Sequence, residues 1–112
     1  MFNSSLNNSL TRANKKEIIE WSMPDWDSGV ALPVDGTETT ITDCGWIGAS
    51  GQSYAATPFN IKINGVEHYV SYFSALGTTS NTLYFPVSPN DKVLVVSGTT
   101  PLYLTFYPCK GA

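Results

Sequence analysis

Few side chains in this 112-residue chain have the types and spacing that chemistry requires. His68 is the only histidine, and neither Cys44 nor Cys109 has a neighbour at metal-ligand spacing, so a zinc site is not expected. Asp25 and Asp27 could share a calcium ion, yet no further acid follows at EF-hand spacing. We therefore expect no metal and no cofactor.

Catalytic arrangements are equally poorly supported. A carboxylate pair for glycoside hydrolysis, drawn from Asp25, Asp27 and Asp43, would need a cleft and a matched separation that the sequence does not show. Residues 45–51 are glycine-rich but lack the lysine of a phosphate loop. His68 falls on the apolar face of a predicted strand, where we expect a half-buried, hydrogen-bonded histidine rather than a catalyst. The chain is not expected to be an enzyme.

Aromatic side chains favour binding instead. The chain has six tyrosines and three tryptophans, whose amphipathic rings are typical of interfaces, although we expect at least half of them to pack in the core or at its rim. Residues 51–54 are predicted to form a polar loop, and Tyr54 within it is the leading candidate for receptor contact. Gln52 and Trp46 complete the predicted binding set.

A second set of polar and aromatic residues lies near the C-terminus. Tyr103, Thr105 and Tyr107 alternate along the predicted last strand and therefore share one face of it. Such a face suits contact with another subunit, so these three residues form the predicted oligomer interface.

Charge is scarce and unevenly placed. Six basic and nine acidic residues give a net charge of −3 and make up 13% of the chain, about half the usual share. The only charged residues between positions 44 and 112 are Lys62, Glu67, Asp91, Lys92 and Lys110. This balance argues against nucleic-acid binding, and no apolar run approaches the length of a membrane helix. No secretory signal is expected, because residues 1–14 lack an apolar core segment.

From Gly29 onward the pattern predicts strands and turns. Residues 59–63 alternate between apolar and polar, and the Asn64-Gly65 pair that follows favours a two-residue type I′ turn. This turn fixes a predicted register in which Ile63 faces Val66, Lys62 faces Glu67, Ile61 faces His68 and Phe59 faces Val70.

Further strands are predicted on both sides of this hairpin. Residues 82–87 form a strand with Pro86 near its end, and hence at a sheet edge, while the apolar run at 92–97 suits a strand buried on both faces. We expect a turn at 98–101. Seven or eight short antiparallel strands without an interior helix predict an all-β, jelly-roll-like sandwich; the remaining strands are expected at residues 37–42, 45–50 and 102–107.

The chain divides into two predicted parts. Residues 23–112 form the sandwich head, and residues 1–22 form a flexible or stalk segment that ends in a short helix at 14–22. The first long strand and the last strand of a jelly roll are often neighbours. We therefore predict that Cys44 and Cys109 lie near each other, remain reduced and pack as small hydrophobes.

Several short motifs resemble the C-terminal head domains of phage tail fibres and related virion fibres. Residues 23–30 (MPDWDSGV) look like the "P-D-[YW]-x-x-G-V" entry of these heads, and residues 63–66 (INGV) are similar to their "[VI]-N-G-V" hairpin. The other resembling segments, in the same order, are residues 43–47 (DCGWI, with Cys44 inserted), 87–93 (VSPNDKV, with Asn90 in place of glycine) and 106–111 (FYPCKG).

The resemblance implies a fibre head and a homotrimer like those of tumour-necrosis-factor type. It further implies location in the virion, attachment to a bacterial surface glycan or protein, and contact with other virion proteins through the N-terminal segment. Two alternatives stay open: a structural capsid-fibre or decoration protein without a receptor, and a carbohydrate-binding module of a bacterial enzyme or adhesin. Glycan binding by a monomer would favour the module, whereas an obligate trimer without glycan binding would favour the structural role.

Overall fold

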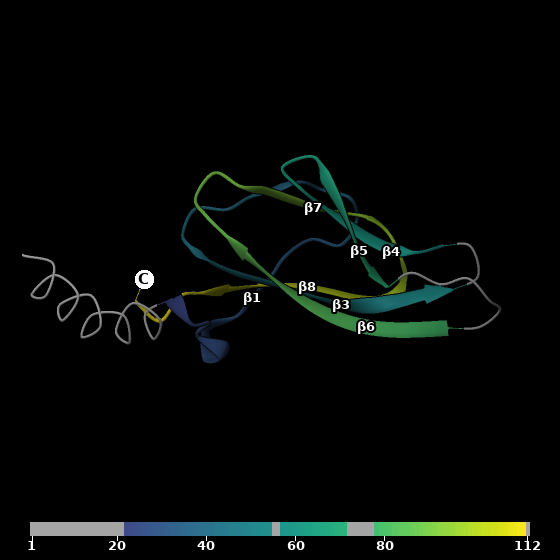
Figure 1. Ribbon diagram of the computed structural model, residues 1–112, viewed down its shortest axis with the longest axis horizontal. Coiled ribbons are helices and arrows are strands. Elements are labelled where there is room, and N and C mark those ends of the chain that lie inside the picture. The colour runs from purple at the N-terminus through teal and green to yellow at the C-terminus, as the bar shows by residue number, and fades with distance from the viewer. Residues whose placement is uncertain (1–21, 55–56, 72–77, 112) are drawn as a thin grey trace, which may run out of the picture.

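The computed structural model of this protein describes residues 22–54, 57–71 and 78–111, and two four-stranded antiparallel sheets account for most of them (Figure 1). The predicted stalk, apart from Ser22, lies outside the described residues. One sheet has the order β1 (Val30–Ala31), β8 (Thr99–Pro108), β3 (Gly45–Tyr54), β6 (Thr78–Val87). The other has the order β2 (Thr39–Thr40), β7 (Lys92–Ser97), β4 (Phe59–Ile63), β5 (Val66–Ser71).

The strand order is that of a jelly roll. The first strand pairs with the eighth, the second with the seventh, the third with the sixth and the fourth with the fifth, as in one long hairpin. The additional pairs β3–β8 and β4–β7 fold this hairpin into two sheets. The predicted all-β sandwich is confirmed, and β6 lies at a sheet edge as Pro86 indicates.

The β4–β5 hairpin forms at the predicted turn. Asn64 and Gly65 both have positive φ angles, 54° and 81°, as a type I′ turn requires. The predicted pairs of Ile63, Lys62 and Ile61 are all present. The expected Phe59–Val70 pair is wrong, because the register shifts between Phe59 and Asn60 and Phe59 lies opposite Ser71.

A buried amide accompanies this shift. Asn60 is buried, and its Oδ1 accepts a hydrogen bond of 2.7 Å from the Ser97 hydroxyl of β7. Its Nδ2 donates to Glu67 Oε2 over 3.5 Å. A buried amide without partners would be costly, so these contacts from two neighbouring strands favour the irregular register.

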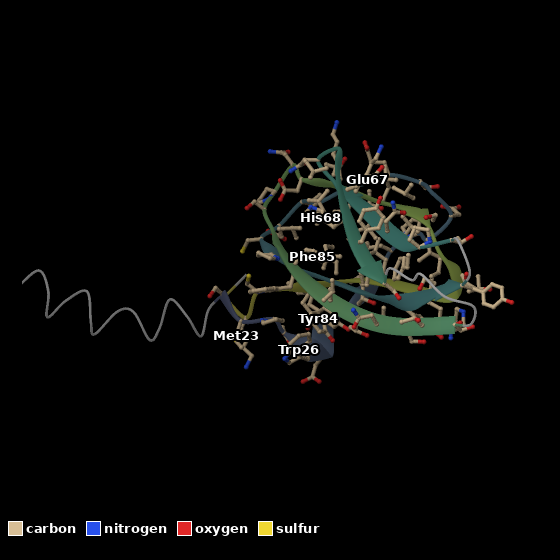
Figure 2. All side chains as sticks on the ribbon, turned by 45° about the vertical axis from the view of Figure 1, so that its right-hand side comes forward. Met23, Trp26, Glu67, His68, Tyr84 and Phe85 are labelled. Carbon is tan, nitrogen blue, oxygen red and sulfur yellow. The ribbon has the colours of Figure 1, made fainter. Side chains whose placement is uncertain are left out.

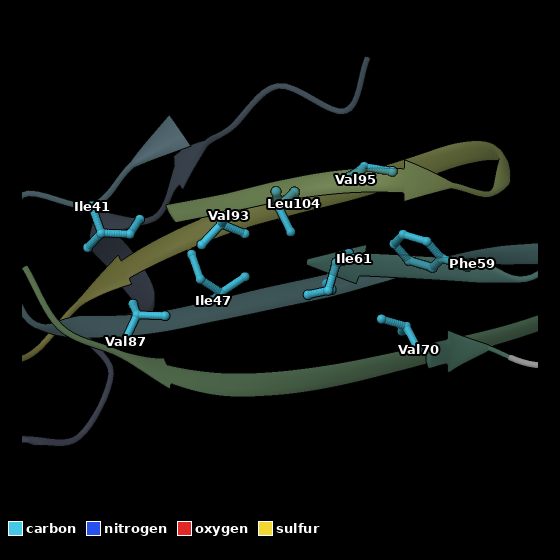
Figure 3. Packing of buried hydrophobic residues seen from close by; sticks show 10 residues of the cluster. Ile41, Ile47, Phe59, Ile61, Val70, Val87, Val93, Val95 and Leu104 are labelled. Carbon is cyan, nitrogen blue, oxygen red and sulfur yellow. The ribbon is translucent and has the colours of Figure 1, made fainter. Parts of the chain in front are cut away.

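The core fills the space between the sheets (Figure 3). Each fully buried apolar side chain contributes about 1.5–3 kcal/mol to folding. The prediction that β7 is buried on both faces is wrong: Val93 and Val95 are buried, whereas Val96 is 43% exposed, because this sheet has only one covered face. The buried cluster also contains Ile41, Ile47, Ala49, Phe59, Ile61, Val70, Val87 and Leu104.

The connection between β7 and β8 also differs from expectation. A turn was expected over residues 98–101, but only Gly98 separates the two strands, and β8 starts at Thr99. Since β7 and β8 belong to different sheets, the chain crosses the sandwich at this glycine. A Cβ there would lie 2.8 Å from the Leu102 side chain, so the crossing leaves no room for one. No helix in the described part of the chain is long and apolar enough to span a membrane.

Candidate functional site

The three long strands β3, β6 and β8 are neighbours in one sheet and contain no charged residue. Each is ten residues long, and none of their residues is Asp, Glu, Lys or Arg. The charged strand residues Lys62, Glu67 and Lys92 lie in the other sheet. Depletion of charged residues is one of the features that distinguish the cores of protein interfaces from the rest of the surface.

The register shows which side chains share the outer face of this sheet. Ile47, Ala49 and Leu104 point into the core, so their strand neighbours point outward. We call the outward-pointing set the uncharged face; it comprises Trp46, Gly48, Ser50, Gln52 and Tyr54 of β3, Thr78, Ser80, Thr82, Tyr84 and Pro86 of β6, and Tyr103, Thr105 and Tyr107 of β8.

Three rings cover the half of this face nearest the described N-terminus. Trp26 packs edge-on against Tyr84, with ring centroids 5.2 Å apart (Figure 2). It packs edge-on against Tyr107 as well, with ring centroids 4.9 Å apart. Gly48 lies beneath them, and a Cβ there would be 2.9 Å from Tyr84 Cε1. Glycine at this position therefore leaves room for both tyrosine rings above β3. Trp26, Tyr84 and Tyr107 together form what we call the aromatic block.

The short helix η1 (Trp26–Ser28) holds Trp26 in this position. Asp25 caps it: Oδ1 accepts from the Asp27 backbone N–H over 3.3 Å, and Oδ2 accepts from the Ser28 hydroxyl over 2.9 Å. Asp25 also donates its backbone N–H to the Pro108 carbonyl. From the sequence, Asp25 was expected at most as a calcium ligand or as one of a carboxylate pair, and Trp26 and Tyr84 were not among the predicted site residues. The Asp-x-x-Ser capping pattern around Trp26 is the signal that could have found η1.

The other half of the face contains a shallow hollow. The β3–β8 ladder is irregular between Ser50 and Gln52, and a hollow of about 150 Å³ opens there. Within the described residues, the Gln52 amide and the Tyr103 hydroxyl have no side-chain hydrogen bond, and Tyr103 is 60% exposed. Both groups are therefore available to a ligand. The hollow is lined by Ser50, Gly51, Gln52, Ser80, Pro101 and Tyr103.

The predicted binding residues do not form a single cluster. Tyr54 was expected in a loop, but it ends β3, because the strand continues beyond Ser50 through its pairing with β6. It is 51% exposed and lies on the same face as Gln52. Trp46 lies eight residues away along the strand, roughly 27 Å. Its indole N–H donates to the Ser22 carbonyl over 2.7 Å, so Trp46 holds the described N-terminal end.

The predicted oligomer-interface residues share the uncharged face with the binding set. Tyr103 borders the hollow, Thr105 lies mid-strand opposite Gly48, and Tyr107 lies under Trp26. Residues assigned to two roles from the sequence thus occupy one surface. It divides into a half with the aromatic block and a half with the hollow and Tyr54.

His68 and the acidic residues of the described part of the chain lie outside this face. His68 is half-buried and its ring packs against Phe85, with centroids 5.2 Å apart (Figure 2). The expected hydrogen bond of its side chain is absent within the described residues. Those residues also contain no cluster of three or more side chains suited to a metal ion.

The two cysteines lie together at the end of the sandwich where the described N-terminal residues enter. The Cys109 backbone N–H donates to the Cys44 carbonyl over 3.3 Å, which confirms the prediction that the two cysteines lie near each other. Both thiols are free in the structure, and that they stay reduced remains a prediction. Cys109 is buried as expected, but Cys44 is exposed, because it precedes the first residue of β3. Both line an open pocket of about 400 Å³ with Ser22, Gly45, Trp46, Pro86, Val87 and Gly111.

No known family model, curated protein or solved structure matches this chain.

Proposed function

We propose that this protein is the head of a virion fibre, which assembles as a homotrimer and attaches a phage to a bacterial surface component. The observation that supports this best is the uncharged face: three neighbouring ten-residue strands without a charge, carrying half-exposed tyrosines. Exposed aromatic side chains on a surface depleted of charge are characteristic of surfaces that become covered by a partner.

The two halves of the face suit two partners. The aromatic block is largely apolar, and Trp26 and Tyr84 are 51% and 49% exposed. A second copy of the chain could bury these rings, with Thr105 and Tyr107 at the same contact. The half with the hollow would then stay open at the far end of the head, where Tyr54, Gln52 and Tyr103 would contact the receptor.

A neutral saccharide fits this open half better than a charged polymer. No ionic group on β3, β6 or β8 could pair with a carboxylate or phosphate. The Tyr54 and Tyr103 rings offer apolar surfaces for a sugar ring, and the Gln52 amide and nearby hydroxyls offer donors and acceptors. The receptor proposed is therefore a neutral surface glycan.

Oligomeric state and binding can be tested with the same protein. Sedimentation velocity of the full chain should show the mass of a trimer. The Trp26→Ala substitution should shift the equilibrium toward smaller species. Labelled protein should bind isolated envelopes from a panel of bacteria and a neutral oligosaccharide array. Tyr54→Ala and Gln52→Ala should each lower binding about tenfold, since both remove a ligand-contacting group.

Tyr69→Ala is the matched control. Tyr69 is exposed to the same extent as Tyr54, 51%, but belongs to the other sheet, so its loss should leave binding unchanged. A monomer that binds glycans would support the carbohydrate-binding module instead. A trimer that binds no envelope and no glycan would support a structural virion protein.

A further inference from the structure

The antiparallel pairing of β3 and β8 places Cys44 and Cys109 directly opposite each other. Gly45 faces Pro108 at the end of the ladder, so the next pair is Cys44 and Cys109. The hydrogen bond from the Cys109 N–H to the Cys44 carbonyl shows that the ladder continues to this pair. Opposed residues in such a ladder have Cα atoms about 4.5–5.5 Å apart, within the roughly 4.4–6.8 Å that a disulfide spans.

The two thiols also differ in a way that suits stepwise oxidation. Cys109 is buried, and its Sγ donates to the Ser22 carbonyl over 3.4 Å. Burial, together with a hydrogen bond between the two cysteine side chains, raises the pKa of Cys109 to about 11. Cys44 is exposed, and the pocket that both cysteines line opens its thiol to small molecules. Cys44 is therefore the thiol that an oxidant meets first.

We propose that Cys44 and Cys109 are a disulfide-forming site, oxidised by a low-molecular-weight disulfide such as glutathione disulfide when the protein leaves a reducing compartment. The Cys44 thiolate attacks one sulfur of glutathione disulfide, the sulfur–sulfur bond breaks, and one glutathione leaves as its thiolate. The Cys109 sulfur, after losing its proton to solvent, attacks Cys44 Sγ in the mixed disulfide and releases the second glutathione. Two protein thiols are oxidised and one glutathione disulfide is reduced to two glutathiones.

The bond would fasten the last described residues to the start of β3. Cys109 also forms an isolated antiparallel β-bridge with Pro24, and Lys110 donates its backbone N–H to the Met23 carbonyl. Residues 22–24 therefore lie beside the two cysteines. The closed loop would contain about 65 residues, a length at which a disulfide strongly restricts the unfolded chain. Oxidation would therefore stabilise the end of the head at which residues 22–24 lie, whether or not the proposed attachment function is correct.

The test is oxidation of the full chain in buffers of defined glutathione to glutathione disulfide ratio. Under non-reducing conditions the intact mass should fall by two hydrogens, and peptide mapping should identify a Cys44–Cys109 link. The melting temperature should rise by roughly 10 °C or more and return to its starting value with dithiothreitol.

Two variants test the order of the steps. The Cys109→Ala protein should form a mixed disulfide with one glutathione at Cys44 and react no further. The Cys44→Ser protein should fold normally, because position 44 is exposed, and it should bind little or no glutathione. Neither should show the rise in melting temperature. The proposal is overturned if the wild-type protein forms no internal disulfide in excess glutathione disulfide, if it forms only intermolecular links, or if oxidation lowers the melting temperature.

Discussion

Gly48→Ala is expected to loosen the aromatic block and destabilise the head. A Cβ at this position would lie 2.9 Å from Tyr84 Cε1 and 3.0 Å from Tyr107 Cε2, closer than ordinary van der Waals contact. In most strands the two rings could turn aside. Here Trp26 packs against both of them, so relief of the clash has to disturb at least one of its contacts.

The size of the effect follows from three contributions. Overpacking of this kind costs about 1–3 kcal/mol. Each edge-on aromatic contact that is lost removes about 0.5–1.5 kcal/mol. Alanine recovers about 0.5–1 kcal/mol relative to glycine within a strand. We therefore expect the Gly48→Ala protein to lose about 1–3 kcal/mol of unfolding free energy.

A double-mutant cycle with Trp26→Ala tests the mechanism. Urea unfolding, followed by far-ultraviolet circular dichroism at one protein concentration, gives the free energy of unfolding for the wild type, both single variants and the double variant. Without Trp26 the tyrosines can shift, so Gly48→Ala should cost at least about 0.5 kcal/mol less in that background. The reasoning is refuted if Gly48→Ala is as stable as the wild type, or if the two changes are additive.

Two other changes probe the turn network and the core. Asp91 accepts hydrogen bonds from the Asn64 side chain and the Ser88 backbone, which lower its pKa, so its stabilising effect is complete above its unfolded pKa and is lost as pH falls through the folded value. Thermal melts between about pH 6 and pH 2 should show a smaller acid loss for Asp91→Asn than for the wild type, and coincident profiles would contradict this. Ile61→Ala removes a fully buried side chain and should cost about 2–5 kcal/mol in urea unfolding, whereas Ile63→Ala, at a half-buried position on the same strand, should cost clearly less; equal losses would contradict this.

The β4–β5 hairpin was predictable because its determinants are local. Asn64 and Gly65 tolerate the positive φ angles of the turn, and the alternation on each side fixes which residues face each other. The register shift at Phe59 was not predictable, since it goes with a buried Asn60 whose partner, Ser97, lies in a strand much later in the chain. Local patterns contain no information about such distant partners.

The candidate site was only partly predictable for the same reason. Alternation within the last strand correctly grouped Tyr103, Thr105 and Tyr107 on one face. Their position beside Gln52 and Tyr54 depends on the β8–β3–β6 order, which is set by how the whole hairpin folds over. The absence of charge from all three strand segments was visible in the sequence, but it does not by itself indicate that they form one surface.

The position of β8 also has a consequence for the order of events during translation. This strand leaves the ribosome after every other described strand, yet it lies between β1 and β3 in the middle of its sheet. Until it emerges, β1 has no strand partner and one edge of β3 stays unpaired. A nascent chain can complete the β4–β5 hairpin early, but it cannot complete the uncharged face. Products that end before β8 would keep the β3 and β6 residues of that face but lack Tyr103, Thr105 and Tyr107, so the chain must include β8 before it can present the complete face.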